Sequence, residues 1–167
     1  MKQENADEYL GKIAPKLEAA TLIVNYGKFD RNWPSKARNI EFEQQLATGT
    51  AGGLKLDLTM NSIWNDVFFP LPPGEYLIRL PDTPHRKDMT AFYKNVEPSL
   101  SHHQVWFPIA FGDGSRYVHV GNVSDGCATV LTLKNWADLH EYLISHRRPD
   151  GNGVGKLILK GKPERER

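Results

Sequence analysis

Glycine and proline divide this chain into short apolar segments, and this division restricts the fold more than any other feature. The 14 glycines and 11 prolines stand between segments rich in β-branched and aromatic residues, which is typical of strands joined by turns. The best helical repeat is confined to residues 135–146, where apolar side chains recur on one face after the candidate cap Asn135. The sequence therefore predicts a mainly β fold, a β-rich α+β protein, with one or two short helices.

Most of the expected strands end at a turn signal. We predict strands at residues 20–26, 75–80, 105–111, 115–120, 127–133 and 154–160, and a weaker start of another at 40–43. Gly112-Asp113-Gly114 predicts a hairpin, and Thr48–Gly53, which lacks a phosphate-loop pattern, predicts a tight turn. Residues 27–39 are polar and predict an irregular connection with a turn at Asn32-Trp33-Pro34, whereas residues 5–20 predict a second short helix.

Length, charge and the N-terminal residues narrow the class of protein. A chain of 167 residues suits a single domain, so we expect one unit over residues 1–167 with its core at about 20–160. The formal net charge of +1 gives no basic field for nucleic acid or an anionic membrane. Residues 1–8 are polar and acidic, and no apolar run reaches the roughly 18–20 residues of a membrane span. We therefore expect synthesis in the cytoplasm without a signal peptide.

Cys127 is the only cysteine of the chain, which excludes an intramolecular disulfide. A single cysteine is more often a small buried apolar residue than a nucleophile, so its neighbours decide the interpretation. His119 ends one predicted strand and Cys127 opens the next, after a short turn of Gly, Asn, Ser and Asp residues. If these strand ends lie side by side, the imidazole comes within hydrogen-bond reach of the thiol, which needs a base or a cation to ionise at neutral pH.

The residues just before Cys127 suit acyl transfer. Gly126 can adopt a positive φ and lets a carbonyl group approach the main chain closely. The backbone N–H groups of residues 125–127 would then stabilise an oxyanion, each by about 2.7–4 kcal/mol in the transition state. On this hypothesis Cys127 attacks the carbonyl, His119 passes a proton to the departing amine, and water or a second amine resolves the acyl-enzyme.

Two segments of the chain resemble segments of one enzyme family, and they follow each other along the chain in the same order as in that family. His119 followed by Ser124-Asp125-Gly126-Cys127 resembles the signature of the L,D-transpeptidase catalytic domain, in which a histidine precedes Ser/Thr-His-Gly-Cys. Upstream, Gly49-Thr50-Ala51-Gly52-Gly53 followed by Pro70–Tyr76 is similar to a run found in the L,D-transpeptidase-like effectors of type VI secretion systems. The resemblance covers roughly residues 20–160.

The resemblance implies a fold, a reaction and partners. It implies an L,D-transpeptidase-like β-sandwich that needs no cofactor and performs L,D-carboxypeptidase or D-amino-acid exchange reactions on peptidoglycan stem tetrapeptides. Such an effector would be secreted into the periplasm of a target cell, with a secretion-system carrier and a cognate immunity protein as partners. Cys127 would be the nucleophile, His119 the base, Gly126 part of the oxyanion hole and Ser124 a support of the loop. Asp125 replaces the histidine usual in the family and supplies no cation, so His119 would carry more of the activation.

A further group of residues is expected to hold the substrate. Arg79 and Arg116 are candidates for the carboxylate of the stem peptide, because a guanidinium binds a carboxylate at two points. The candidates for the groove wall are Trp106, Tyr117, Gly121 and Asn122. Residues 81–101 are the candidate lid. His102-His103 have no third ligand at a suitable spacing, so no metal site is predicted.

Two other classes of protein remain open. A papain-like or other cysteine peptidase normally carries its cysteine before its histidine, at a helix N-terminus, whereas here the histidine comes first and Cys127 begins a strand. A non-catalytic binding or inhibitor module on a related scaffold would leave the thiol inert. Labelling with a thiol-reactive probe distinguishes these classes from the proposed enzyme.

Overall fold

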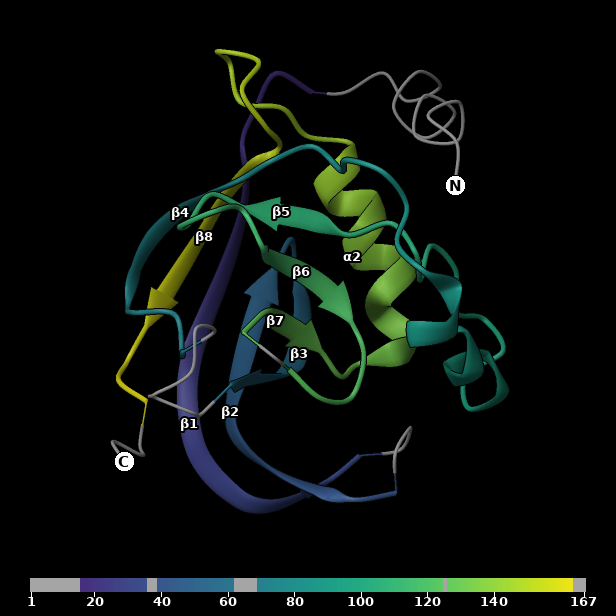
Figure 1. Cartoon of the computed structure of the whole chain (residues 1–167). Coiled ribbons are helices and arrows are strands. Elements are labelled where there is room, and N and C mark those ends of the chain that lie inside the picture. The colour runs from purple at the N-terminus through teal and green to yellow at the C-terminus, as the bar shows by residue number, and fades with distance from the viewer. Residues whose placement is uncertain (1–15, 36–38, 62–68, 125, 164–167) are drawn as a thin grey trace.

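The computed structural model describes residues 16–35, 39–61, 69–124 and 126–163. Its strands are β1 (Ala20–Pro34), β2 (Glu41–Ala51), β3 (Leu54–Asn61), β4 (Gly74–Ile78), β5 (Phe107–Ile109), β6 (Arg116–Val120), β7 (Ala128–Val130) and β8 (Gly155–Lys160). The described helical elements are the 3₁₀ turns η1 (Lys87–Met89), η2 (Ala91–Asn95) and η3 (Leu133–Asn135) and the helix α2 (Trp136–Ile144). Strands dominate and α2 lies beside the sheet (Figure 1), so the mainly β prediction is confirmed.

The strands hydrogen-bond in the closed order β1-β2-β3-β7-β6-β5-β4-β8, and β8 returns to pair with β1. The β1–β8 and β6–β7 pairs are parallel and the others antiparallel. The resemblance implied a sandwich of two sheets, whereas this sheet closes into a barrel. Closure follows because the N-terminal strand pairs with β2 on one side and with the last strand on the other, which leaves neither with an open edge.

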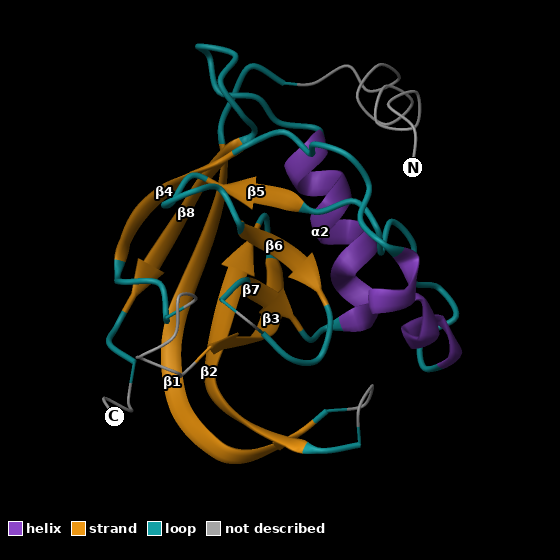
Figure 2. Ribbon diagram, in the orientation of Figure 1, coloured by secondary structure: helices purple, strands orange, loops and turns teal. Residues whose placement is uncertain are grey.

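One prediction about the N-terminal half is wrong. Residues 27–34 belong to β1, which continues to Pro34 and pairs with β2 as far as Glu41, with irregularities in register after Tyr26 and Asp30. Figure 2 shows this two-stranded arm curving away from the rest of the sheet. Along most of its length the arm does not pack against the hydrophobic core. Its residues are therefore mostly polar and carry no alternating apolar pattern.

The other predicted elements correspond to observed ones. The strands at 20–26, 75–80, 105–111, 115–120, 127–133 and 154–160 correspond to β1, β4, β5, β6, β7 and β8, and the strand start at 40–43 to β2. The Gly112–Gly114 turn joins β5 to β6. Of the tight turn expected at Thr48–Gly53, only Gly52-Gly53 forms a turn, between β2 and β3, because Thr48–Ala51 continue strand β2. The predicted cap Asn135 makes no side-chain cap hydrogen bond, because η3 leads directly into α2. The second helix, predicted at 5–20, falls mostly outside the described residues.

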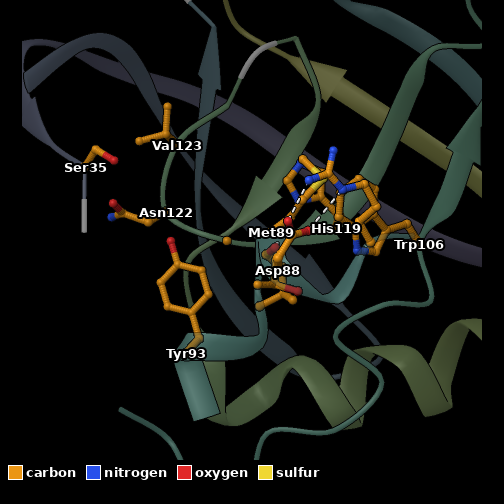
Figure 3. A pocket seen from close by; sticks show the side chains of 12 residues that line it. Ser35, Asp88, Met89, Tyr93, Trp106, His119, Asn122 and Val123 are labelled. Carbon is orange, nitrogen blue, oxygen red and sulfur yellow. Dashed lines mark hydrogen bonds and ion pairs between the residues drawn. The ribbon is translucent and has the colours of Figure 1, made fainter. Parts of the chain in front are cut away.

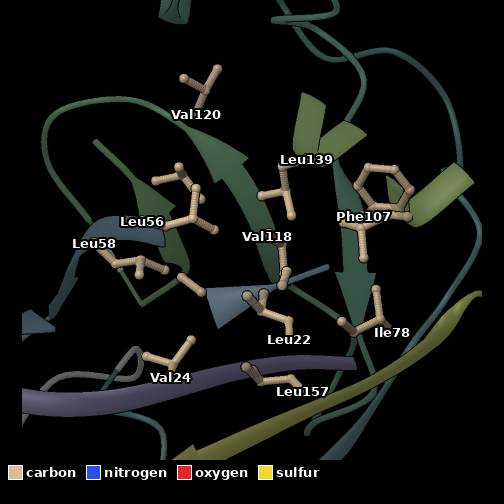
Figure 4. Packing of buried hydrophobic residues seen from close by; sticks show 14 of the residues in the cluster. Leu22, Val24, Leu56, Leu58, Ile78, Phe107, Val118, Val120, Leu139 and Leu157 are labelled. Atoms are coloured by element: carbon tan, nitrogen blue, oxygen red, sulfur yellow. The ribbon is translucent and has the colours of Figure 1, made fainter. Parts of the chain in front are cut away.

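Apolar side chains from every side of the barrel meet in its interior (Figure 4), among them Leu22, Leu58, Ile78, Val118 and Leu157. Each contributes about 1.5–3 kcal/mol relative to an exposed position. On β6 and β7 the inward residues are Val118, Val120, Ala128 and Val130. The alternation of strand side chains therefore places His119 and Thr129 on the outer face. Within the described residues, no helix has the length and apolar character that crossing a membrane requires.

Candidate functional site

The pairing of β6 with β7 determines which residue lies beside His119. The two strands are parallel, with Val118 opposite Ala128 and His119 opposite Thr129. The end of β6 and the start of β7 therefore do not lie side by side as expected, because that arrangement requires strands of opposite direction, and Thr129 takes the position directly opposite His119. Cys127 instead precedes β7, two positions before Thr129, the residue that faces the imidazole.

The His119 ring is held at both nitrogens. Nδ1 lies 2.9 Å from the carbonyl oxygen of Val120, which can only accept, so Nδ1 carries the proton. Nε2 lies 3.1 Å from Thr129 Oγ1 and accepts the hydroxyl proton. The side chain is only 8% exposed. Burial lowers the pKa of His119 to about 4, with a smaller opposing effect of the Val120 carbonyl and a further lowering by His85. The imidazole is therefore neutral at pH 7.

Aromatic rings cover His119 on the outer face. Trp106 stacks on His119 with a centroid distance of 4.3 Å, and His85 stacks on Trp106 at 4.0 Å. Tyr117 meets both Trp106 and His85 edge-on, and its hydroxyl donates to Asp82 at 3.2 Å. Asp82 and His85 belong to residues 81–101, the predicted lid. This segment therefore packs over the face that carries His119.

A cavity of about 440 Å³ opens beside His119 (Figure 3). Its wall combines residues of the lid segment, Trp106 before β5, the end of β6 with the following loop, and the tip of the arm: Arg86, Asp88, Met89, Thr90, Tyr93, Trp106, His119, Val120, Gly121, Asn122, Val123 and Ser35. Arg86 and Asp88 form a two-point ion pair with distances of 3.1 and 2.6 Å. The predicted groove residues Trp106, Gly121 and Asn122 thus line a real cavity, with one charge of each sign in its wall.

The loop before Cys127 has the backbone that the sequence predicted. Gly126 has φ +106°, in the region that favours glycine. Ser124 Oγ accepts the Gly126 N–H at 3.1 Å and donates to the Cys127 carbonyl at 2.6 Å, so Ser124 braces the loop as expected. The same bond occupies the Gly126 N–H, which contradicts its expected availability to an oxyanion. Cys127 itself is partly exposed, and Asp125 lies outside the described residues.

Arg116, a candidate binder of the substrate carboxylate, is buried and engaged with the main chain. It is 3% exposed and donates through Nη1 to the carbonyl oxygens of Phe69 and Gly126, at 2.9 and 3.0 Å. The guanidinium also lies 5.2 Å from the ring centroids of Phe69 and Phe111. Burial lowers the pKa of Arg116, whereas the charge of an ionised Cys127 raises it. The sequence identified Arg116 as a candidate for the site but not its contacts, because the Phe69 and Phe111 rings that cover it are distant in sequence.

The remaining candidates lie apart from the cavity or have structural contacts. Arg79 is exposed after β4 and is absent from the cavity wall. His102 stacks on His140 while the His103 ring contacts the Thr90 hydroxyl, and among the described residues no three potential ligands gather as a metal ion requires. Trp33, which the sequence did not single out, donates from its indole N–H to the Asn122 carbonyl at 2.6 Å and ties the arm to the cavity loop.

The site thus combines a partly exposed thiol, a buried guanidinium and a neutral imidazole around the ends of β6 and β7. A cavity adjoins the imidazole. Comparisons with protein-family models, with curated proteins and with solved structures find no match to this chain.

Proposed function

We propose that this protein is a cysteine-dependent enzyme of the L,D-transpeptidase type that acts on peptidoglycan stem tetrapeptides. One observation carries the proposal: Cys127 is partly exposed directly after a glycine with φ +106°, on a loop beside the strand that bears His119 and Arg116. The Gly-Thr-Ala-Gly-Gly and Pro-rich segments upstream support the same family. That the closed sheet is an L,D-transpeptidase-like fold is part of this proposal.

In the proposed reaction the Cys127 sulfur attacks the carbonyl carbon of the bond before the terminal D-residue. The thiol proton passes to Nε2 of His119, since Nδ1 already holds a proton on the Val120 carbonyl. To receive it, Nε2 exchanges the Thr129 hydroxyl for the thiol. The C–N bond then breaks, the amine leaves with that proton, and a thioester remains. Water resolves the thioester in carboxypeptidase action, and a D-amino acid does so in exchange.

The cavity beside His119 supports a peptide substrate. Its volume of about 440 Å³ falls in the range of sites that hold compact ligands. In its wall, Arg86 can pair with the carboxylate of a stem peptide, and Asp88 can pair with the amino groups that the peptide carries. The apolar side chains of Met89 and Val123, also in the wall, can pack against the alkyl parts of the peptide.

Purified protein incubated with tetrapeptide muropeptides tests the chemistry. We expect loss or exchange of the terminal D-alanine, read by mass spectrometry, and no turnover in Cys127→Ala. His119→Gln should lower turnover roughly 10²–10⁴-fold, as removal of a general base does. Glu18→Ala, at an exposed position before β1, is the control that keeps activity. Turnover by Cys127→Ala at the wild-type rate would exclude a cysteine nucleophile.

The proposed role as an antibacterial effector has its own test. Expression directed to the periplasm of a Gram-negative cell should arrest growth, and Cys127→Ala should remove the effect. A cognate immunity protein, co-expressed in the periplasm, is expected to restore growth. Equal toxicity of the wild type and of Cys127→Ala would contradict the role.

A non-catalytic binding module is the second candidate, and the hydrogen bonds at the site favour it. Both nitrogens of His119 and the N–H of Gly126 are already occupied within the protein. A module of this kind would hold its ligand in the cavity without turnover. Calorimetry with a tetrapeptide would then show binding that Arg86→Gln weakens, together with a thiol that no reagent labels selectively.

A further inference from the structure

We infer that Arg116 is the positioning residue that makes Cys127 reactive: its buried guanidinium holds the Gly126–Cys127 peptide and stabilises the thiolate. The inference rests on the proposed use of Cys127 as a nucleophile. It assigns the activating charge to an arginine on β6, where the sequence had assigned activation to His119.

The guanidinium is fixed close to the cysteine. Its Nη1 atom lies 3.0 Å from the carbonyl oxygen of Gly126, the residue bonded to Cys127. A second bond, to the Phe69 carbonyl, and the rings of Phe69 and Phe111 keep the group in place. With 3% of the residue exposed, water screens the charge poorly. The cation therefore acts on the loop at short range and in a constant position.

The electrostatics point in the same direction. Burial lowers the pKa of Arg116, and the ionised sulfur of Cys127 is the largest of the influences that raise it. The two charges therefore stabilise each other. His119, whose pKa burial lowers to about 4, is neutral at pH 7 and supplies no cation to the thiolate.

Among the described residues, the groups whose charges act on Arg116, together with Tyr117, which interacts with the charge of Cys127, keep their charge state near neutral pH. They are Tyr26 of β1, Tyr76 of β4, Asp113 of the β5–β6 turn and Tyr117 of β6. Burial raises the pKa of each tyrosine above its ordinary value. Hydrogen bonds with Ser115 lower the pKa of Asp113. Between about pH 6 and 9 these groups do not titrate, so a change in thiol reactivity over that range reports Cys127.

The test is the rate of alkylation of the full-length protein by iodoacetamide as a function of pH. A cysteine beside a cation reaches half its maximal rate at or below about pH 7.5, against about 8.5 for an isolated thiol. We expect the wild type below about pH 7.5. Arg116→Gln should raise this midpoint by at least about one pH unit, and Arg116→Lys, which keeps the charge, by less. Arg79→Gln removes the same charge from an exposed position and should leave the midpoint unchanged.

The outcomes separate this inference from the proposed function. A wild-type midpoint above about pH 7.5 overturns the inference, even if Arg116→Gln fails to fold, which circular dichroism reports. A folded Arg116→Gln with the wild-type midpoint also overturns it. Labelling needs no substrate. A shifted midpoint without turnover of muropeptides therefore removes the acyl-transfer proposal alone, whereas turnover with an unshifted midpoint removes the role of Arg116 alone.

Discussion

Thr129 lies directly opposite His119 on the neighbouring parallel strand, and its hydroxyl donates to Nε2 across 3.1 Å. The bond holds the nitrogen that would serve as the base, while Nδ1 is held by the Val120 carbonyl. The imidazole therefore rests in a closed hydrogen-bonded arrangement. In the proposed reaction, the Thr129 hydroxyl must release Nε2 to the thiol. The bond that stabilises the fold at Thr129 would therefore have to break for activity.

Thr129→Val tests the strength of that bond. Valine keeps the shape of the side chain but leaves Nε2 buried without its donor, which costs about 1–3 kcal/mol. We expect a loss of this size in the free energy of unfolding, measured by urea denaturation at pH 7. Thr50→Val, at an exposed position of β2, is the control and should stay within about 0.5 kcal/mol of the wild type. Equal losses in the two variants would show that the bond does not form in solution.

Gly126→Ala tests the backbone of the loop before Cys127. At φ +106° an L-residue is strained, which costs about 1–3 kcal/mol. We expect a lower melting temperature and slower alkylation of Cys127, because the loop shifts away from its bond with Ser124. Gly112→Ala is the matched control: its φ of +59° also strains an L-residue, but nothing lies within 4 Å of the added Cβ and the β5–β6 turn does not hold Cys127, so alkylation should be unchanged. The prediction fails if both variants keep wild-type alkylation rates.

Trp33→Phe tests whether the arm is fastened to the cavity loop. Phenylalanine retains an aromatic ring but loses the N–H that donates to the Asn122 carbonyl at 2.6 Å. We expect faster amide hydrogen exchange at residues 28–33 and a loss of about 1 kcal/mol in unfolding free energy. Phe29→Leu, elsewhere on β1, is the control for loss of aromatic surface alone. Unchanged exchange in Trp33→Phe would mean that the arm is held by its strand pairing only.

Local patterns in the sequence were sufficient for most strands and for α2. Val118 and Val120 alternate with Tyr117 and His119, and this alternation sets both the strand and its inward face. The spacing of Leu139 and Leu143 did the same for the helix. The arm was missed because both of its faces are largely open to solvent, so no apolar period marks residues 28–34.

The arrangement of the site depended on contacts that no local pattern contains. The alternation in β6 and in β7 is the same whether they pair in parallel or antiparallel, so the partner of His119 could not be assigned. Ser124 and Gly126 were identified because their roles are local to the loop. The inward direction of Arg116 depends on Phe69 and Phe111, which are distant in sequence.

Two buried histidines should make folding depend on pH. Burial lowers the pKa of His119 to about 4, and burial together with His102 lowers that of His140 to about 3. The residues are 8% and 1% exposed, respectively. In the unfolded chain both titrate near pH 6.5. Below that pH the unfolded state binds protons that the folded state does not, so stability is full above pH 6.5 and falls as the solution is acidified towards pH 4.

Each histidine should contribute a slope of about 1.4 kcal/mol per pH unit in this window, because one proton separates the two states. The measurement is the urea midpoint and m-value at intervals from pH 7.5 to 5. His140→Phe places an aromatic ring among Phe107, Trp136 and the stacked His102, and should remove about half of the combined slope while the protein remains folded. If the variant keeps the full slope, His140 is not protonated on unfolding over this range. The acid sensitivity would then come from His119 and other groups, because loss of a titrating histidine must lower the number of protons taken up on unfolding.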